Sequence, residues 1–412
     1  MAFEASRITR SAIRVSGFRD AEFDYQLLRT MGLSDYGGST VGECLAAAAM
    51  IADGDTSSWT RTFSALASRI ESAADACLER GHTLSARDHL LRASTYHRTA
   101  EYYAEADPQS LLESGRKGRQ CFERAMSLGD SGVETVAVPF EGTHLPGYLV
   151  HPRDFDAGKD RTKLIVVVGG FDSSAEELYF QLGVAGGERG WHVLVFDGPG
   201  QSECMRLHPE LTFRPDYEVP IAAVLDYVRS REDVGSAPLA LAGVSFGGYF
   251  AARAASRDTR IRALVTNPPV VDLYRYMEAW LGSPVFLSRK DIRPQDVEGV
   301  PEDLLLPQMA WGIVAVCRRF GVPSLHRWLE ELDEFRLGDA LSQITCPVLA
   351  IIGEREGPEV SRQAEDLEKG VSGATTLRRF SIDDGADSHG SVGNLRLATQ
   401  VVYDWLDEVF AT

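Results

Sequence analysis

The feature that most constrains the fold is the segment 239–250, where an apolar run leads into Gly243-Val244-Ser245-Phe246-Gly247. The run predicts a buried strand, and the small residues that follow the motif predict a closely packed helix. Glycines two positions before and after a serine are typical of a strand-to-helix turn that is too tight for side chains. Such a turn holds the serine hydroxyl above the sheet edge, at the positive end of a helix dipole. The segment therefore predicts that Ser245 is a nucleophile.

Helical patterns occupy the first third of the chain. Between about residues 20 and 128, apolar residues recur every three or four positions, which predicts amphipathic helices. The clearest of these helices are expected over 59–77, 85–103 and 110–126. Gly81 is expected to end the first, and Ser85-Ala86-Arg87-Asp88 resembles a capping box for the second.

From residue 133 onward, short apolar runs alternate with helical segments, which predicts a mostly parallel sheet covered on both faces. The eight expected strands are 133–140, 145–151, 164–168, 192–196, 239–242, 263–265, 348–352 and 376–380. The alternation lapses after the sixth strand, and that stretch predicts an inserted lid. We therefore expect an α/β chain with a helical cap or dimerisation domain over 1–130. A catalytic domain over 131–412 would carry the lid at about 271–341.

Composition and charge exclude several classes of function. The 412 residues carry a net charge of −18, which disfavours nucleic acid and anionic membrane surfaces as partners. The first residues have charges where a signal peptide needs an apolar stretch, and the sequence has no run long enough to span a bilayer. The six cysteines lack metal-ligand spacing, and no nucleotide or flavin fingerprint is present. The sequence thus predicts a cytoplasmic protein without metal or cofactor.

A serine hydroxyl becomes a good nucleophile only when a base removes its proton. His389 follows the last expected strand and precedes the final helix, where the base belongs in proteins with this motif. The acid that orients the histidine should follow the strand 348–352, and the spacing there favours Glu356. Glu354 and Asp272 remain alternatives for the acid.

The oxyanion of a tetrahedral intermediate needs backbone N–H donors. The residue after the nucleophile, Phe246, is expected to supply one donor. The glycine-rich loop after the third strand is expected to supply the second from Phe171, with Gly170 as the alternative. The loop Asp197-Gly198-Pro199-Gly200-Gln201-Ser202, after the fourth strand, is interpreted as an architectural turn whose acid makes structural hydrogen bonds.

Four segments in this order resemble one branch of the α/β-hydrolases. That branch contains 2,6-dihydroxypseudooxynicotine hydrolases, FrsA-like proteins and fungal pigment-pathway hydrolases that shorten a heptaketide. The matching residues are Trp59 with Gly81-His82 and Ser85-Ala86-Arg87, then Gly169-Gly170-Phe171-Asp172-Ser173, then Gly243, Ser245, Gly247 and Gly248, and finally Ala386-Asp387, His389 and Asn394. The resemblance covers nearly the whole chain.

The resemblance implies a serine hydrolase that cleaves a carbon–carbon bond next to a ketone in an aromatic or polyketide-like small molecule, and a homodimer. It carries Ser245 over as nucleophile and His389 as base, whereas related proteins have aspartate at the acid position held here by Glu356. Further candidate pocket residues are Glu278, as a lid carboxylate, with Tyr274, Trp280 and Asp172. The aromatic side chains of the lid, which include Tyr276, Phe286 and Trp311, could line the pocket or simply be core.

Three other functions remain open at this point. A carboxylesterase or lactonase would use the same triad with an alkoxide leaving group. An acyltransferase or cyclase would pass the acyl group from the serine to a hydroxyl. A binding protein that retains the fold without catalysis is the third, and an intact set of catalytic residues argues against it.

Overall fold

The computed structural model describes residues 15, 17–105, 107–153, 162–281, 291–297 and 307–411. The chain forms two compact units. The helical unit comprises Arg14–Val133 and Ile292–Leu325, and the sheet unit includes Glu134–Asp291 and His326–Thr412. The chain therefore leaves the helical unit, forms most of the sheet, and later returns to the helical unit.

The helical unit contains α1 (Ala21–Gly32), η2 (Leu33–Tyr36), α2 (Val41–Ala48), α3 (Thr56–Glu79), α4 (Thr83–Tyr102), α5 (Pro108–Ser127), α13 (Pro294–Val297) and α14 (Pro307–Phe320). The helix predicted over 59–77 is α3, which buries one apolar face through Trp59 and Phe63. It begins where the Asp55 carboxylate accepts the Ser58 N–H at 2.9 Å. It ends before Gly81, whose φ of +76° suits a glycine at this position, as predicted.

The capping box predicted at Ser85 is wrong. Helix α4 already begins at Thr83, so Ser85 lies inside its first turn. The N-cap is His82, whose side chain makes no capping hydrogen bond. The preceding glycine reverses the chain within three residues, and the backbone N–H of Ala86 donates to the His82 carbonyl at 3.0 Å. The short connection, rather than a side-chain cap, sets where α4 begins.

Part of the segment predicted as a lid packs within the helical unit. On α14, the Trp311 indole N–H donates to the Tyr102 carbonyl, and the two rings stack at 4.6 Å. The Arg318 guanidinium binds both carboxylate oxygens of Glu105 at 2.7 Å. Trp311 is thus core of this unit, whereas Phe286 lies outside the described residues.

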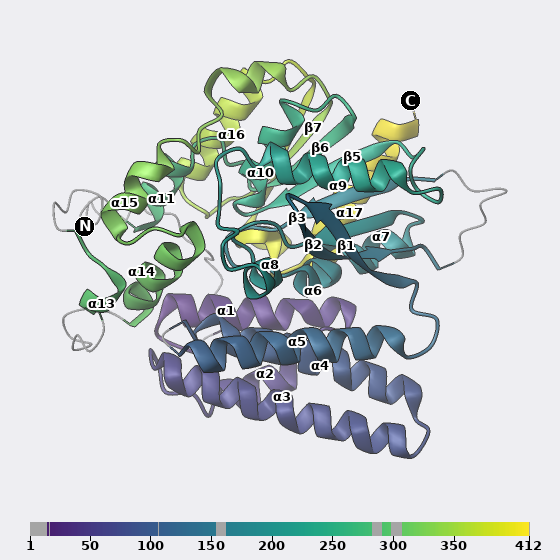
Figure 1. Cartoon of the computed structure of the whole chain (residues 1–412), viewed down its shortest axis with the longest axis vertical. Helices are drawn as coiled ribbons and strands as arrows, with labels where there is room; N and C mark the ends of the chain where they lie inside the picture. The colour runs from purple at the N-terminus through teal and green to yellow at the C-terminus, as the bar shows by residue number, and fades with distance from the viewer. Residues whose placement is uncertain are drawn as a thin grey trace. The chain divides into compact units, whose positions relative to one another are not determined.

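The sheet unit is built on one eight-stranded sheet in the order β1-β2-β4-β3-β5-β6-β7-β8. Figure 1 shows its strands β5, β6 and β7 side by side. Its strands are β1 (Val133–Phe140), β2 (Thr143–Val150), β3 (Leu164–Val168), β4 (His192–Phe196), β5 (Leu239–Val244), β6 (Ile261–Asn267), β7 (Val348–Gly353) and β8 (Thr375–Phe380). β2 pairs antiparallel with β4, and the pairs from β4 through β8 are parallel. All eight strands predicted from the sequence are present.

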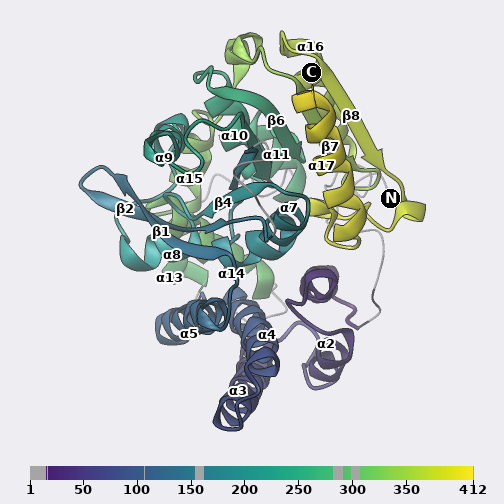
Figure 2. The same cartoon turned by 90° about the vertical axis from the view of Figure 1, so that its right-hand side faces the viewer.

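Helices cover both faces of this sheet. The strands β3, β4, β5 and β7 are therefore buried on both faces, which explains why their sequences are continuously apolar. The remaining elements are α6 (Ala175–Leu178), the π-helix η3 (Tyr179–Gly183), α7 (Val184–Glu188), α8 (Ser202–Leu207), α9 (Glu218–Ser230), α10 (Gly247–Ala255), α11 (Leu273–Leu281), α15 (Leu325–Leu332), η4 (Gly338–Gln343), α16 (Pro358–Gly370), η5 (Ile382–Asp384), η6 (His389–Ser391) and α17 (Leu395–Ala411). Figure 2 shows α7 and α17 on one face of the sheet, with α9 and α10 on the other.

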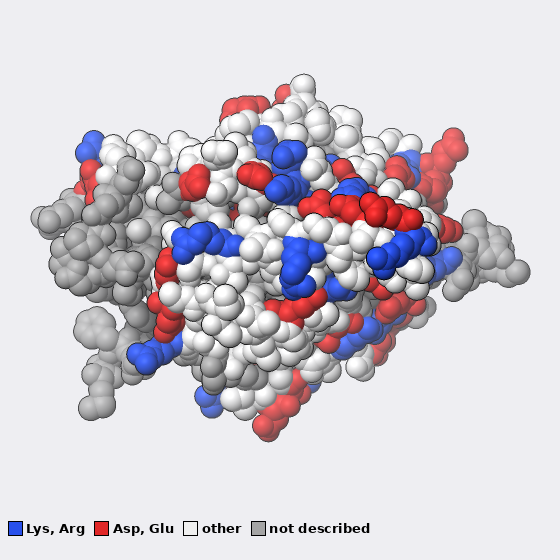
Figure 3. Space-filling model, turned by 90° about the horizontal axis from the view of Figure 1, so that it is seen from below, with Lys and Arg blue, Asp and Glu red and all other residues white. Residues whose placement is uncertain are grey.

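The charged surface is mixed rather than segregated on the face that Figure 3 shows, where acidic and basic side chains lie side by side. Ion pairs along α5 are an example, with Lys117 and Arg119 each 2.8 Å from a glutamate four positions away. Among the described helices, none is both long and apolar enough to cross a bilayer.

Candidate active site

Ser245 occupies the tight turn that the sequence predicts between β5 and α10. Its φ of +59° is in the left-handed region, which is strained for a serine. A side chain at Gly243 would collide with the backbone of Gly247, and one at Gly247 would collide with the Val168 carbonyl. Both glycines are therefore required for the elbow. The turn leaves Ser245 partly exposed at the N-terminus of α10.

Three side chains predicted from separate parts of the sequence form one hydrogen-bonded line. The Oγ of Ser245 lies 2.9 Å from Nε2 of His389, and Nδ1 of His389 lies 2.8 Å from Oε1 of Glu356. The other carboxylate oxygen of Glu356 accepts the N–H of Gly353 at 2.7 Å. Glu356 is fully buried and His389 is 7% exposed, so the ring orientation is well defined. This geometry allows His389 to accept the Ser245 proton.

The two alternative acids make other contacts. Glu354 is exposed, and its backbone N–H extends the pairing with β8 by donating to the Phe380 carbonyl. Asp272 caps the start of α11 by accepting the Arg275 N–H at 2.9 Å and lies 3.5 Å from the Arg336 guanidinium. Of the three candidates, Glu356 is the one that the structure brings to His389.

The oxyanion-hole candidates lie beside the nucleophile. A Cβ added to Gly170 would lie 2.9 Å from both the Ser245 Oγ and the Phe246 nitrogen. The loop after β3 therefore passes directly against the elbow. The Gly170 N–H itself donates to the Ser173 Oγ at 3.0 Å, so this donor is already engaged. The geometry accordingly favours Phe171 over Gly170 as the donor from this loop.

An aromatic wall flanks Ser245, formed by Phe171, Phe213, Phe246 and Tyr276. Phe171 stacks on Phe213 with ring centroids 5.9 Å apart and meets Phe246 edge-on at 5.7 Å. Tyr276 meets Phe246 edge-on at 6.2 Å. Phe171 is only partly buried, while the other three rings are buried. The wall provides an apolar surface next to the nucleophile, with its rings set at different angles.

The predicted pocket residues lie on helix α11 and beside Phe171. Tyr274, Glu278 and Trp280 lie on α11 and are half-buried, and Arg336 packs over the Tyr274 ring at 5.2 Å. Because residues two apart on a helix point in different directions, Glu278 does not share the orientation by which Tyr276 meets the aromatic wall. Asp172 is half-buried next to Phe171.

Asn267 was not singled out from the sequence, and Asp387 was named only among the residues that carry the family resemblance. Asn267, at the end of β6, accepts the Ser245 N–H through its carbonyl at 2.8 Å, and its side-chain amide donates to the Ser391 Oγ at 3.1 Å. It thereby links the nucleophile turn to the histidine loop. Asp387 is fully buried, and neither carboxylate oxygen has a hydrogen-bond partner among the described residues. Burial raises the pKa of Asp387, which favours its neutral form.

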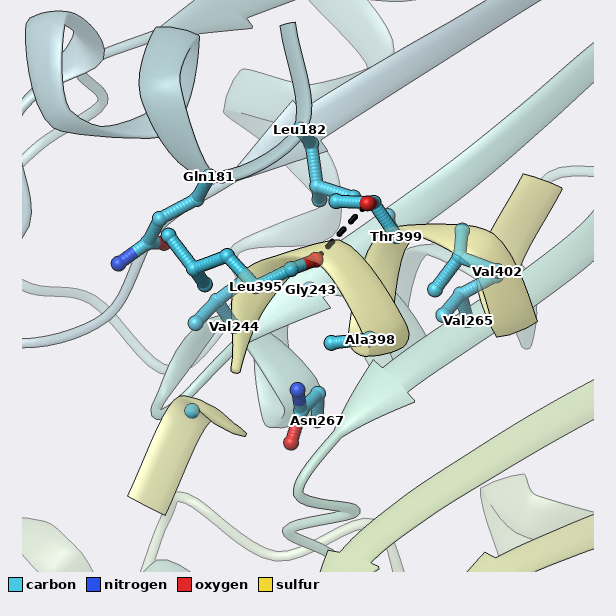
Figure 4. A pocket seen from close by; sticks show the side chains of 12 residues that line it. Gln181, Leu182, Gly243, Val244, Val265, Asn267, Leu395, Ala398, Thr399 and Val402 are labelled. Atoms are coloured by element: carbon cyan, nitrogen blue, oxygen red, sulfur yellow. Dashed lines mark hydrogen bonds between the residues drawn. The ribbon is translucent and has the colours of Figure 1, made fainter. Parts of the chain in front are cut away.

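A small cavity lies between the strands β5 and β6 and helix α17 (Figure 4). It is lined by Gly243 and Val244 before the nucleophile, by Gly390 after the base, and by residues of α17. Its volume of about 30 Å³ leaves room for roughly two water molecules, so it is too small for an organic substrate.

Clusters with metal-ligand spacing occur elsewhere among the described residues and include no triad residue. They are Glu71, His97 and Cys121 in the helical unit and Glu134, His151 and Asp233 in the sheet unit. In the second cluster, Arg231 binds both acids, at 2.7 Å from Glu134 and 2.8 Å from Asp233. The chemistry described for Ser245 does not draw on either cluster.

A nucleophile turn on a mostly parallel sheet of eight strands defines the class of α/β-hydrolases. The family model described as alpha/beta hydrolase fold matches residues 163–294. The chain is 31% identical to Hydrolase ORFZ of Pyricularia oryzae over 417 residues, covering 95% of this chain and 97% of that protein. It is 32% identical to Hydrolyase poxO of Penicillium oxalicum, covering 81% and 82%.

Among solved structures, 2,6-dihydroxy-pseudo-oxynicotine hydrolase shares the fold with a TM-score of 0.67 and 20% sequence identity, covering 92% of this chain and 95% of that one. The chain therefore belongs to the α/β-hydrolase family. The fold class and the resemblance predicted from the sequence are confirmed.

Proposed function

We propose that this chain is a serine hydrolase that forms an acyl intermediate on Ser245 and cleaves a carbon–carbon bond next to a ketone. The substrate would be an aromatic or polyketide-like small molecule. The observation that carries the proposal is the continuous hydrogen-bonded line from Ser245 through His389 to the buried Glu356. Each member of that line has the chemical type and position that acyl transfer to a serine requires.

In the first half of the reaction, Nε2 of His389 takes the proton of Ser245 as Oγ attacks the substrate ketone. The negative charge that develops on the ketone oxygen is stabilised by the N–H groups of Phe246 and Phe171. Glu356 holds the Nδ1–H of His389, which fixes the ring tautomer and stabilises the imidazolium without taking the proton.

In the second half, the tetrahedral intermediate collapses and breaks the carbon–carbon bond. The electron pair leaves on carbon, so the leaving group must be a stabilised carbanion, such as the enolate of a 1,3-diketone or a hydroxylated ring. His389 returns its proton to that carbanion, and an acyl-serine remains. His389 then deprotonates a water molecule that hydrolyses the acyl-serine and restores the free enzyme.

The substrate class rests on the aromatic wall and on the family resemblance. Phe171 stacks on Phe213 beside the nucleophile, and a partly exposed ring offers an unsaturated substrate a stacking surface. The related structure is that of a hydrolase named for a dihydroxylated substrate. A flat, electron-rich acyl compound fits both features.

Hydrolysis of a carboxylic ester or lactone is the second candidate. An alkoxide leaves more easily than a carbanion and needs no additional acid near the leaving group. The orientation of Glu278 favours this alternative, because Glu278 lies two positions from Tyr276 and points elsewhere on α11.

The test pairs an aryl 1,3-diketone with the aryl ester of the same acyl group and measures kcat/KM for each. The proposal expects diketone cleavage that Ser245→Ala abolishes and that Ser256→Ala, at the far end of α10, leaves unchanged. Cleavage of the ester alone would move the protein to the esterases. Turnover that persists in Ser245→Ala would contradict both candidates.

Two further expectations concern assembly and location. We propose a homodimer, which the family resemblance supports, and a cytoplasmic location. Light scattering coupled to gel filtration tests the dimer, which predicts twice the chain mass of 45.2 kDa.

A further inference from the structure

Gln201, in the loop after β4, has its side-chain amide fully committed to backbone groups. Its Nε2 donates to the carbonyls of Gly169 at 2.6 Å and Gly170 at 3.1 Å. Its Oε1 accepts the Gly198 N–H at 2.7 Å, and the residue is fully buried. Because two partners only accept and the third only donates, the amide can adopt just one orientation.

These bonds bear on the peptide that joins Gly170 to Phe171. In a trans peptide the C=O and the following N–H point in opposite directions. Gln201 holds the Gly170 carbonyl from the side of the β4 loop, so the Phe171 N–H is turned the other way. Gly170 itself lies against Ser245 and the Phe246 nitrogen. The preceding peptide is fixed in the same manner, since the Gly169 carbonyl binds Gln201 and the Gly170 N–H binds Ser173.

We infer that Gln201 is a positioning residue for the oxyanion hole: it orients the Phe171 N–H toward the developing oxyanion at Ser245. The inference rests on the proposed function, in which Phe171 supplies one of the two donors. Gln201 touches neither the serine nor the substrate and acts through the loop that it holds. The loop interpreted from the sequence as an architectural turn thereby also contributes to catalysis.

The chemistry of the side chain is specific to an amide. A glutamate at this position has the same shape and keeps an acceptor for the Gly198 N–H, but it places an oxygen against two carbonyl oxygens. Methionine has a similar length and leaves all three backbone groups without their partner. Both changes are expected to free the Gly170–Phe171 peptide to rotate.

The experiment compares p-nitrophenyl acetate with its thionoester analogue, in which sulfur replaces the carbonyl oxygen. Sulfur accepts hydrogen bonds poorly, so the ratio of kcat for the two esters reports on the oxyanion hole. Gln201→Met is expected to lower kcat for the oxygen ester on the order of 100-fold with little change in KM. The thionoester should lose much less, so the ratio falls.

Gln363→Met is the matched control. Gln363 is also fully buried in the sheet unit, where its amide binds the backbone of Val271 and Asp272. This variant should lose stability comparably and keep the wild-type ratio. If Gln201→Met does not fold, Gln201→Glu carries the same expectation, with thermal unfolding as the check on folding.

Two outcomes would overturn the inference: an unchanged ratio in the folded Gln201 variant, or an equal fall in Gln363→Met. Failure of the proposed serine chemistry, which carbon–carbon and ester cleavage share, gives a different result. In that case the wild-type protein shows no turnover of either ester that depends on Ser245.

Discussion

At the scale of single residues, Glu356 has two distinct tasks, one for each carboxylate oxygen. One oxygen faces Nδ1 of His389, and the other accepts the N–H of Gly353 at the end of β7. The second bond locks the carboxylate in the orientation that the first requires. Glutamate can therefore serve as the orienting acid, because the backbone bond compensates for the freedom of its long side chain.

Glu356→Gln tests this assignment. The amide can place its oxygen toward one partner only, and an NH₂ group facing Nδ1 favours the wrong histidine tautomer. We expect kcat to fall about 10⁴-fold, as is typical when the triad acid becomes an amide. Glu354→Gln is the control, because Glu354 is exposed on the same turn, and it should retain full activity. Steady-state kinetics with an aryl ester measures both, and a larger loss in the Glu354 variant would contradict the assignment.

Gly170→Ala tests the space beside the nucleophile. An added Cβ would lie 2.5 Å from the Ser245 Cβ and 2.9 Å from its Oγ, where the substrate carbonyl must fit. We expect kcat/KM to fall about 10²- to 10³-fold, comparable to the loss of an oxyanion donor. Gly42→Ala, which meets no atom within 4 Å, should leave activity unchanged. Equal activity of the two variants would mean that the substrate approaches from elsewhere.

At the scale of elements, the loop after β4 brings a buried acid under the active-site loops. Asp197 is 1% exposed, and its Oδ2 accepts the Glu203 N–H at 2.9 Å. Burial, reinforced by the charge of Glu176, raises the pKa of Asp197 to about 8. The folded protein thus holds a proton on this carboxyl that the unfolded chain releases near pH 4.

The stability of the protein should therefore depend on this group between about pH 4 and pH 8. Since the folded state binds the proton more tightly, the free energy of unfolding falls as pH rises through this range. Asp197→Asn keeps an acceptor for the Glu203 N–H and removes the titration. In thermal unfolding, the melting temperature of the Asn variant should rise relative to that of the wild type from pH 5 to pH 8. Asp404→Asn, at an exposed position of α17, should show no such trend, and a constant difference for Asp197→Asn would contradict the account.

The strands and the nucleophile turn could be predicted from the sequence because they depend on local patterns. Continuous apolar runs indicate strands that are buried on both faces. The glycines around Ser245 indicate a turn without room for side chains. Ser245 followed from its glycine motif, and His389 from its place after the last strand. The spacing after the strand favours Glu356 over Glu354, and the structure adds that Glu356 is buried and bonded to His389 whereas Glu354 is exposed.

Other features depend on contacts between distant segments, which a local pattern does not encode. Gln201 reaches the loop after β3 across 32 sequence positions, and Asn267 reaches Ser391 across 124. An amphipathic pattern predicts α14 as a helix but not the surface against which its apolar face packs. These residues could therefore not be identified from the sequence.

At the scale of the whole molecule, the chain completes its helical unit with a segment that follows the sixth strand. Helix α14 packs there through Trp311 and through the ion pair of Arg318 with Glu105. Glu105 is 5% exposed, so its charge depends on that partner. The helical unit is therefore complete only when residues Ile292–Leu325 have joined residues Arg14–Val133.

Arg318→Met should destabilise the helical unit by on the order of 2 kcal/mol, because it leaves the Glu105 carboxylate buried with only the weaker contact to Arg319 at 3.7 Å. Urea denaturation followed by circular dichroism measures the change. Arg293→Met, which breaks an exposed pair with Asp296, should change the unfolding free energy by less than about 0.5 kcal/mol. Similar values for the two variants would show that the buried pair is not what holds α14.

The central claim is that Ser245, activated by His389, is the nucleophile of this protein. Its most direct test is the mass of the intact protein after incubation with a fluorophosphonate, which loses fluoride as the serine oxygen bonds to phosphorus. We expect one adduct per chain, mapped to Ser245, absent in Ser245→Ala and formed far more slowly in His389→Ala. An adduct that persists in Ser245→Ala, or no adduct on the folded wild-type protein, would contradict the claim.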